Sequence, residues 1–568
     1  MKHEIHRIHA YRSSALPRFV FGLLAAAAAT ALAACGGGGG GGGGSSSGQT
    51  VGGSISGLLS SGLVLSNGST TLAPASGATS FTFPTALASG TAYTVSIQTQ
   101  PAGLTCTVSN ASGTIGSSAV VSVAVVCPTP WLYQAGSRTA KAAGTYGTKG
   151  VAAAGNVPGA RDGGAAWTDP SGDLWLFGGY GYDSTGTLGY LGDLWKYSTA
   201  AGEWTWVAGS QVAGTAGTYG SLGLAAAANA PGARQGASTW TDATTGVLWL
   251  FGGFQSQSGI PGGQLNDLWA YSVASGQWTW IGGSNAPNAP GAYGSLGVWT
   301  AGNVPGARAG AASWRDAAGN LWLFGGSEYD TVAGNNNGLN DLWEYSPGTN
   351  RWIWIGGSKT FAAAGVYGSI GAGSASTVPG ARDGAVAWVD SAGDFWLFGG
   401  VGIDSKDNPP NALNDLWKYS PAPGSGQWTW ISGSNVNSAD GVYGTLGTAA
   451  GANVPGARNA AAGWTDASGN LWLIGGTGYD TLGNGGALND VWKFSPGSAE
   501  WTWVTGSPVQ GSAGAYTSVD VPGAISPGGR AGASAWADGE GHFWLFGGDG
   551  LDSVATLAQL NDLWEFKP

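Results

Sequence analysis

Charged side chains are scarce in this sequence of 568 residues, because only 9% of them are Asp, Glu, Lys or Arg. Acidic residues outnumber basic ones by 32 to 21. Removal of residues 1–34, which have the features of a signal segment, leaves 17 basic and 31 acidic side chains and a net charge near −14. A chain this negative repels nucleic acid, and its positive charge is too sparse to follow a phosphate backbone. We therefore expect no nucleic-acid partner.

Histidine and cysteine are also rare, with four and three copies. Three of the histidines, His3, His6 and His9, fall within the signal segment, which leaves His542 in the mature chain. This scarcity excludes a nucleophile and base built from cysteine or histidine. A phosphate-binding loop is missing too, because no glycine pair is followed by a helix that begins with Gly-Lys-Ser/Thr. These motifs predict no catalytic residue and no metal ligand.

Residues 1–34 are typical of a secretory signal, with a basic start, sixteen apolar residues at positions 19–34 and small residues at the cut. The alternative is an uncleaved anchor helix. Leu32-Ala33-Ala34-Cys35 resembles the bacterial lipoprotein signal, in which Cys35 becomes the acylated first residue of the mature protein. The residue after Cys35 is glycine and not the aspartate of an inner-membrane retention signal. We expect an outer-membrane lipoprotein that faces the periplasm or the cell surface.

The next two segments read as a tether and a small domain. Residues 35–50 contain nine consecutive glycines and several serines, which indicates a flexible tether. Residues 51–128 contain about seven short alternating or β-branched runs, which predict a small β-sandwich. Cys106 and Cys127 lie in the last two runs, and in an exported protein we expect a disulfide between them. Two free thiols or half of a metal site are the alternatives, but no histidine lies nearby.

Glycine and tryptophan are abundant, with 106 and 30 copies, which is typical of turns and aromatic strands. Residues 174–179, Leu-Trp-Leu-Phe-Gly-Gly, return five more times with hardly a change. The second glycines of the copies are spaced by 74, 73, 74, 76 and 72 residues and are Gly179, Gly253, Gly326, Gly400, Gly476 and Gly548. This regular spacing indicates one supersecondary unit copied along the chain.

Each copy is expected to form four antiparallel strands. In the first copy these are residues 161–167, 173–177, 193–197 and 203–207, with a turn at residues 168–172 between the first two. A double glycine follows the second strand, Tyr197 lies in the third and Trp204 in the fourth. This pattern resembles the kelch motif, and the resemblance covers residues 131–568. Kelch repeats run near fifty residues. The surplus here lies mainly between the fourth strand and the next first strand, as in residues 209–233.

The two ends of the repeat region complement each other. The last copy stops after its third strand, and residues 131–137 align with the fourth-strand residues 204–210. A ring uses such fragments to complete one shared blade and hide its edge strands. We predict an all-β fold, with a six-bladed kelch β-propeller closed by residues 131–135 and preceded by an Ig-like β-sandwich. Five tryptophans recur at matching positions in blades one to five, where they are expected to pack between blades, and only Trp299 falls outside this pattern.

In such a propeller, the loops between strands two and three and between strand four and the next blade leave on the same side. Both are long here, so we expect a binding surface there. The candidate ligand-binding residues are an aspartate that recurs in five of these loops and the tyrosine that precedes it in three: Asp183, Asp330, Asp404, Asp480, Asp552, Tyr182, Tyr329 and Tyr479. They could bind sugar hydroxyls or calcium. Alternatively, each aspartate accepts hydrogen bonds from its own loop.

Two further sets recur once in each blade. Arginines enter the first strand at Arg161, Arg234, Arg308, Arg382, Arg458 and Arg530. Aspartates open the third strand at Asp193, Asp267, Asp341, Asp415, Asp490 and Asp562. We predict one partly buried ion pair in each blade that fixes strand register, with a positive ring for an anion as the alternative.

A tyrosine also recurs in the long segment between blades. It is followed by glycine at Tyr146, Tyr219, Tyr293, Tyr367 and Tyr443, whereas the last blade has Tyr516-Thr517. These tyrosines either anchor the segment or form exposed contacts, and the sequence leaves both interpretations open.

Kelch propellers include galactose oxidase, and that resemblance raises the question of copper. The copper site in that family needs two histidines, two tyrosines and a cysteine bonded to one tyrosine, so His542 alone leaves copper chemistry without ligands. Kelch sugar mutarotases work without metal, and a glycosidase needs only two placed acids. The main asymmetry among the blades is Phe254-Gln255-Ser256-Gln257 in blade two, and lesser ones are Glu328, Lys406, Asp407 and Asp549.

The expected function is therefore that of a monomeric, membrane-anchored module that binds a glycan or protein through its long loops. We expect no cofactor, and calcium is the one alternative. The first alternative is an enzyme that acts on sugars through carboxylates in the central funnel. The second is a structural protein of the cell envelope.

Overall fold

The computed structural model describes residues 48–568 except 59–60, 76–77, 102–104, 128–129, 258–259, 331–334, 422–425, 522 and 524. Every regular element in this part is a β-strand. The predicted signal segment, Cys35 and most of the tether lie outside the described residues. Among the residues described, no helix is long and apolar enough to cross a membrane.

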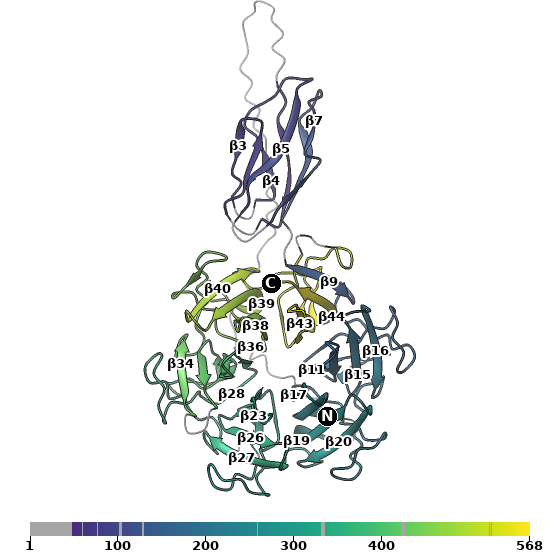
Figure 1. The fold of residues 1–568 in the computed structure, drawn as a ribbon, viewed down its shortest axis with the longest axis vertical. Helices are drawn as coiled ribbons and strands as arrows, with labels where there is room; N and C mark the ends of the chain where they lie inside the picture. The colour runs from purple at the N-terminus through teal and green to yellow at the C-terminus, as the bar shows by residue number, and fades with distance from the viewer. Residues whose placement is uncertain are drawn as a thin grey trace, which may run out of the picture. The chain divides into compact units, whose positions relative to one another are not determined.

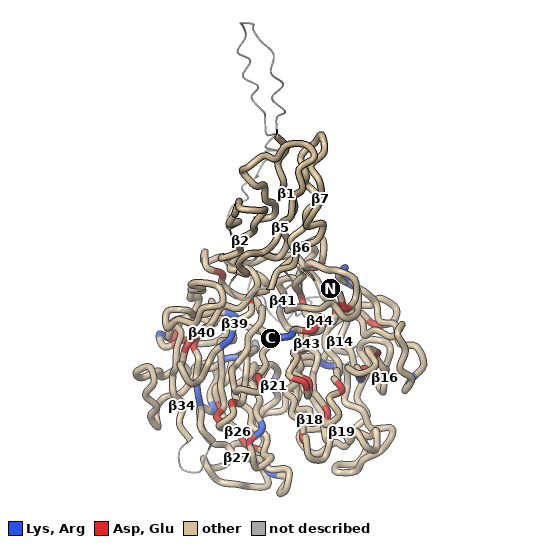
Figure 2. The backbone as a smooth tube through the Cα atoms, turned by 45° about the horizontal axis from the view of Figure 1, so that its top comes forward, with Lys and Arg blue, Asp and Glu red and all other residues tan. Residues whose placement is uncertain are grey.

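Residues 51–126 form two four-stranded sheets around one hydrophobic core, which includes Val51, Leu65 and Val123. The first sheet contains, in order, β4 (Ser80–Thr82), β1 (Val51–Ser56), β8 (Val120–Val126) and β6 (Thr107–Ser109). The second contains β3 (Thr70–Leu72), β2 (Val64–Asn67), β5 (Ala92–Thr99) and β7 (Ser112–Thr114). The disulfide between Cys106 and Cys127 is confirmed. No charged residue occurs between Arg18 and Arg138, so the strands of this region carry neither blue nor red in Figure 2.

Residues 131–568 form antiparallel four-stranded meanders in a propeller-like arrangement (Figure 1). The first sheet comprises β11 (Ala165–Thr168), β12 (Leu174–Phe177), β15 (Leu194–Ser198) and β16 (Glu203–Ala208). The second comprises β17 (Ser238–Asp242), β18 (Val247–Gln257), β19 (Ile260–Ser272) and β20 (Gln277–Gly282). The third comprises β22 (Ala312–Arg315), β23 (Leu321–Phe324), β26 (Leu342–Ser346) and β27 (Arg351–Gly356).

The remaining meanders repeat this order. The fourth sheet comprises β29 (Val386–Val389), β30 (Phe395–Phe398), β33 (Leu416–Tyr419) and β34 (Trp428–Ser432). The fifth comprises β37 (Ala462–Thr465), β38 (Leu471–Tyr479), β39 (Gly485–Ser495) and β40 (Glu500–Thr505). The sixth comprises β42 (Ser534–Ala537), β43 (Phe543–Leu551), β44 (Leu557–Phe566) and β9 (Trp131–Ala135).

Strand β9 joins the sixth sheet as its edge strand. It runs antiparallel to β44, with Trp131 opposite Phe566 and Tyr133 opposite Trp564. The indole of Trp131 packs edge-on against the rings of Trp564 and Phe566. The first residues of the repeat region therefore supply the strand that the last copy lacks.

A cycle of backbone hydrogen bonds links the sheets at their centre. The N–H of Gly163 donates to the carbonyl of Gly532, and the N–H of Gly236 donates to that of Gly163. The series continues through Gly310, Gly384 and Ala460, and it closes where the N–H of Gly532 donates to the carbonyl of Ala460. Side chains fill the space between neighbouring sheets, as where Trp167 and Trp175 of the first sheet pack with Leu250 and Trp269 of the second.

The expected first strand is divided in two. Residues 161–167 form β10 (Arg161–Asp162) and β11, because Gly163 takes a φ of 63° between them. Short strands equivalent to β10 are β21 (Arg308–Ala309), β28 (Arg382–Asp383), β36 (Arg458–Asn459) and β41 (Arg530–Ala531). Each pairs with the chain just after Gly-Gly.

The loop between the second and third strands is a hairpin. In three sheets it forms separate strands: β13 (Tyr180–Tyr182) with β14 (Leu188–Tyr190), β24 (Ser327–Asp330) with β25 (Asn335–Gly338), and β31 (Val401–Gly402) with β32 (Asn411–Ala412). The double glycine before it is needed for contact with the next sheet. A Cβ on Gly178 would lie 2.6 Å from the carbonyl oxygen of Arg234, and Gly178 takes a φ of 67°.

The long segments between sheets cover the outer edge strands. The N–H groups of Gly150, Gly223, Gly297, Gly371 and Gly447 donate to carbonyls of β16, β20, β27, β34 and β40, and Asp520 donates to Tyr133 of β9. In the fifth sheet this contact extends into strand β35 (Ala449–Ala450), which pairs with β40. Edge strands left open would invite pairing with other chains, so these segments protect the sheet edges.

Candidate functional site

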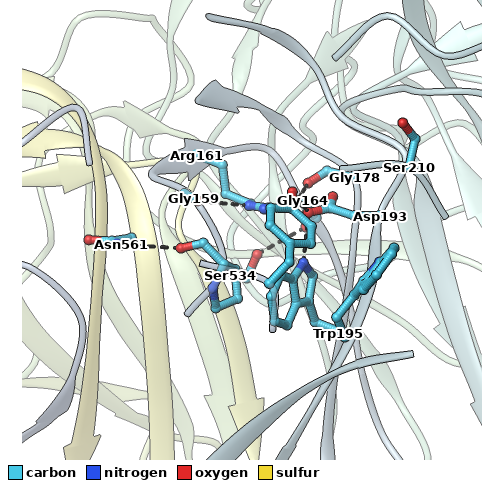
Figure 3. A network of polar contacts seen from close by, with 12 residues as sticks. Gly159, Arg161, Gly164, Gly178, Asp193, Trp195, Ser210, Ser534 and Asn561 are labelled. Carbon is cyan, nitrogen blue, oxygen red and sulfur yellow. Dashed lines mark hydrogen bonds and ion pairs between the residues drawn. The ribbon is translucent and has the colours of Figure 1, made fainter. Parts of the chain in front are cut away.

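Buried arginines bond the aspartate that opens the third strand of the same sheet, as Figure 3 shows for the first network. Nη1 and Nη2 of Arg161 donate to the two carboxylate oxygens of Asp193 at 2.7 and 2.8 Å. Nε and Nη1 also donate to the carbonyls of Gly159 and Gly178. The same pairing joins Arg234–Asp267, Arg308–Asp341, Arg382–Asp415, Arg458–Asp490 and Arg530–Asp562. None of these side chains exposes more than 2% of its surface.

The pair remains ionised despite its burial. Burial by itself raises the pKa of Asp193, but the Arg161 charge and hydrogen bonds from Arg161, Tyr146 and Trp195 hold it below its ordinary value. Burial lowers the pKa of Arg161, and Asp193 more than reverses this. The pairs are thus buried more fully than the sequence predicted, and their guanidinium groups are not available to an anion from solvent.

The recurring tyrosines of the long segments bond to these same aspartates. The hydroxyl of Tyr146 donates to Asp193 Oδ2 at 2.7 Å. Equivalent bonds are formed by Tyr219, Tyr293, Tyr367, Tyr443 and Tyr516. The tyrosines therefore anchor the segments that cover the sheet edges, and Tyr516 does so although Thr517 follows it.

Four of the loop aspartates are engaged in their own hairpins. Oδ1 of Asp183 accepts the N–H groups of Thr185 and Thr187, and Oδ2 accepts that of Ala213 in the following long segment. The same three-bond arrangement occurs at Asp404, Asp480 and Asp552. All four are at most 2% exposed. Burial raises their pKa values, but the hydrogen bonds outweigh burial and hold them below the ordinary range.

The other loop candidates do not share this environment. The side chain of Asp330 lies outside the described part of the chain. Tyr329 is 36% exposed and Tyr182 is partly buried. The hydroxyl of Tyr479 accepts a hydrogen bond from Asn411 Nδ2 at 3.1 Å.

A different group of side chains lies at the centre of the ring. It comes from three positions in each repeat: the residue after the arginine, the first residue after Gly-Gly, and its partner across the hairpin. A Cβ on Gly532 would lie 3.4 Å from the Cβ of Asp162, and one on Gly163 would lie 3.4 Å from the Cβ of Gln235. The position after the arginine therefore packs against the glycines of the central hydrogen-bond cycle.

The two hairpin positions differ strongly between the two halves of the ring. The position after the arginine does not follow this division, because it is Asp162 and Gln235 on one half and Asp383 and Asn459 on the other. In the sixth, first and second sheets, the hairpin pairs are Asp549–Gln559, Tyr180–Tyr190 and Phe254–Gln264. In the third, fourth and fifth they are Ser327–Gly338, Val401–Ala412 and Thr477–Ala487. At the hairpin positions, large polar and aromatic side chains thus gather on one half and small ones on the other. We use the name central wall for these residues of the sixth, first and second sheets: Asp162, Tyr180, Tyr190, Gln235, Phe254, Asp549 and Gln559.

The central wall combines aromatic contacts with unusual carboxylate chemistry. The ring centroids of Tyr180 and Tyr190 lie 5.0 Å apart, and those of Tyr190 and Phe254 lie 5.5 Å apart. Burial, together with the Asp549 charge, raises the pKa of Asp162 to about 7, and a hydrogen bond from Gln559 offsets part of this shift.

Two acceptor atoms of the wall are buried without a partner. Asp162 Oδ1 and Gln235 Oε1 accept no hydrogen bond from the described residues, and Gln235 is only 3% exposed. An unpaired buried acceptor costs on the order of 1–3 kcal/mol. Hydroxyl or amide donors of a ligand could recover part of this free energy.

No protein-family model matches this chain, and no curated protein matches it by sequence. Its function must therefore be inferred from the chemistry of its own residues.

The described residues contain no cluster of side chains suited to a metal ion. Among them, no group of three or more His, Cys, Asp or Glu side chains is placed to hold a metal ion. The loop aspartates considered for calcium, such as Asp183, already accept three backbone N–H groups.

The opposite end of the ring has a hollow of about 490 Å³, lined by the ends of first strands in the sixth, first and second sheets. Its carboxylates are already engaged. Asp169 accepts the indole N–H of Trp175, and Asp538 accepts that of Trp544. The central wall is consequently a better candidate for a ligand-binding site than this hollow.

Proposed function

We propose that this chain is an exported lipoprotein whose six-bladed kelch-type propeller binds a glycan at the central wall. The observation that carries the proposal is the concentration of Tyr180, Tyr190 and Phe254 at the hairpin positions of neighbouring sheets in an otherwise regular repeat. Repetition explains side chains that occur in every sheet. It does not explain a set confined to one half of the ring.

Several features support the six-bladed kelch interpretation. The closed cycle of central hydrogen bonds passes through one residue in each meander. The meander order, the strained double glycine and the shared sixth sheet agree with the sequence resemblance. An Ig-like sandwich for residues 51–128 is supported by two sheets on a common core and the Cys106–Cys127 bond.

The chemistry of the wall suits a sugar. Aromatic faces pack against the C–H surfaces of a pyranose, while carboxylate and amide groups bond its hydroxyls. The small side chains on the other half, such as Ser327 and Val401, occupy less of the ring centre than Tyr180 does at the matching position.

A glycan array with the chain lacking residues 1–47 tests this proposal. We expect saturable binding to one glycan class and a loss of at least tenfold in affinity with Tyr180→Ala. Val401→Ala is the matched control, because Val401 holds the same repeat position on the other half, and it should leave binding unchanged. Retention of no glycan, or equal effects of both variants, would contradict the proposal. Asp183 and Asp480 are unsuitable probes, since their carboxylates hold the hairpins.

The second candidate is an enzyme that acts on sugars through the same wall. It is favoured by the carboxyl group of Asp162, whose pKa burial and Asp549 raise to about 7, since such a group can exchange a proton at neutral pH. Incubation with the bound glycan, followed by NMR for a new anomer or cleaved product, separates the two functions. Turnover that Asp162→Asn abolishes supports the enzyme. Binding without product supports the binding module. The absence of both binding and turnover supports a structural role in the envelope.

The membrane anchor is tested separately. We expect labelled palmitate to be incorporated into the full chain in a bacterial host, and Cys35→Ser to abolish it. Release of the Cys35→Ser chain into the soluble fraction would support an anchor through this residue, whereas unchanged membrane association would favour an uncleaved helix.

A further inference from the structure

A second concave site lies on the third sheet, away from the central wall. It is a hollow of about 390 Å³ lined by Trp299, Asn320, Ser346, Thr349 and Arg351. This volume lies within the range of small-molecule sites. The hollow is at the turn end of the sheet, because Asn320 precedes β23 and Ser346 ends β26.

Trp299 is the tryptophan that the repeat pattern does not explain. It stands six residues after Tyr293, where four of the other five copies have Ala or Gly: Ala152, Ala225, Gly373 and Ala449. Its side chain is 38% exposed, whereas Trp314 and Trp343 of the same sheet are at most 2% exposed. The sheet packing therefore does not require an indole at this position.

Arg351 breaks the repeat at the same hollow. The residue just before the first tryptophan of the fourth strand is Glu203, Gln277, Gln427 or Glu500 in four other repeats. Arg351 is exposed, and its guanidinium forms no hydrogen bond or ion pair with the described residues. It is thus unlike the six arginines of the buried networks.

The hollow is held in place by the backbone around it. Gly297 N–H donates to the carbonyl of Trp354 in β27, and Asn303 Nδ2 donates to the carbonyl of Val298. These bonds fix the segment that carries Trp299 along the edge of the sheet. Ser346 and Arg351 are cross-strand partners in β26 and β27, so they lie side by side on one face.

The polar groups of the hollow favour an anionic ligand with hydroxyls. The hydroxyls of Ser346 and Thr349 enter no hydrogen bond within the described residues, and both can donate or accept. The planar guanidinium of Arg351 can bond a carboxylate through two parallel N–H groups. The exposed indole offers an apolar face to the C–H surface of a sugar ring.

The acidic residue Glu344 on the same face does not exclude an anionic ligand. Glu344 lies two residues before Ser346 in β26 and so shares its face. Burial, with a smaller contribution from the Asp316 charge, raises the pKa of Glu344 to about 7. In a substantial fraction of the molecules, the carboxyl group of Glu344 is therefore protonated and neutral at pH 7.

We infer that the hollow formed by Trp299 and Arg351 on the third sheet is a second carbohydrate site, specific for a sugar that carries a carboxylate. The ligand class is a uronate oligosaccharide, with the ring packed on Trp299 and the carboxylate paired with Arg351. Two residues that depart from the repeat converge on one hollow, and neither is needed by the fold. The inference does not depend on the central wall binding a glycan.

Titration calorimetry of the full chain in detergent tests this site with oligomers of galacturonate, glucuronate and alginate, and with their carboxyl-reduced forms as neutral probes. We expect one uronate class to bind. Trp299→Ala should weaken that binding at least tenfold, and Ala152 at the matching position shows that the segment tolerates alanine. Arg351→Gln, which restores the residue of the second and fourth sheets, should weaken the uronate at least tenfold and leave the neutral form almost unaffected.

Matched controls distinguish this site from the central wall. Leu224→Ala alters an exposed apolar side chain in the corresponding segment of the second sheet, and Tyr180→Ala alters the wall. Neither should change uronate affinity. Binding of no uronate, equal binding of the neutral form, or retention of affinity by both Trp299→Ala and Arg351→Gln would each overturn the inference. Loss of binding with Tyr180→Ala alone would assign the uronate to the wall and overturn it as well.

Discussion

At the residue scale, the buried arginines and aspartates act as connectors inside each sheet. The two carboxylate oxygens of Asp341 accept from Arg308 at 2.7 and 2.8 Å, and Oδ2 also accepts from Tyr293 and Trp343. One carboxylate thus joins the strand entry, the third strand and the segment that covers the edge. Its removal affects all three at once.

Asp341→Asn should lower the free energy of unfolding by about 3–5 kcal/mol, because the guanidinium of Arg308 would remain buried without a counter-charge. The control is Asp173→Asn, whose partner Lys196 is 32% exposed, and it should cost less than about 1 kcal/mol. Urea unfolding followed by tryptophan fluorescence measures both. Equal costs would show that burial does not set the value of these pairs.

Glu344 predicts a pH-dependent stability. Burial, with the Asp316 charge, raises its pKa in the folded chain to about 7 from an ordinary value of 4.5. The folded state therefore binds this proton more tightly than the unfolded state, and stability falls as the pH rises from about 4.5 to 7. Glu344→Gln should stabilise the protein above pH 8, on the order of 1 kcal/mol after solvent screening, and have little effect at pH 4. Melting temperatures of both forms across this range measure the difference. A constant offset at all pH values would contradict it.

At the element scale, β9 takes the place of a fourth strand from a distant part of the chain. Trp131 is 1% exposed, as is Trp204 at the matching position of the first sheet. The N–H of Asp520 also bonds to Tyr133, so β9 receives the same edge cover as the other outer strands. Its contribution should therefore resemble that of a strand continuous with its sheet.

Trp131→Ala should cost about 3–5 kcal/mol of stability, the usual range for loss of a buried tryptophan. Trp204→Ala is the matched comparison, since it removes the same side chain from a strand joined to β15 by a short turn. We expect similar losses in thermal unfolding. A much smaller loss for Trp131→Ala would mean that the sixth sheet is stable without β9.

At the scale of the whole molecule, two kinds of stabilisation serve two regions. Residues 51–128 contain the Cys106–Cys127 disulfide, whereas the repeats carry every tryptophan, beginning with Trp131. Fluorescence of tryptophan therefore reports on residues 131–568 alone.

Reduction with dithiothreitol should destabilise the region of residues 51–128 by about 3 kcal/mol, the value for a closed loop of about twenty residues. The tryptophan-detected transition should not move, while far-ultraviolet circular dichroism should show an earlier loss of strand signal. Cys106→Ala with Cys127→Ala provides the matched variant without a reductant. A shift in the tryptophan transition would show that the two regions unfold together.

For the loop aspartates, the structure decided between two interpretations that the sequence left open. The loop aspartates recur in the sequence like ligands of a ring, yet Asp183 and its equivalents point into their own hairpins, where backbone amides hold them. A local pattern cannot show whether a carboxylate turns inward or outward. The sequence singled out Phe254 and Asp549 as departures from the repeat, but it did not place them with Asp162, because these residues belong to different repeats.

The sequence by itself determined the strand order, the double-glycine turns, the cysteine pair and the fragment at residue 131 that completes the last sheet. These follow from short-range periodicity and from comparison of one repeat with another. Only the tertiary structure decided that Asp162 lies close enough to Asp549 to feel its charge, that Gln235 Oε1 is buried without a hydrogen bond, and that Trp299 and Arg351 share a hollow. Such contacts depend on how separate parts of the chain pack in space. The burial and the electrostatic environment of each residue are set by neighbours that lie far away in the sequence.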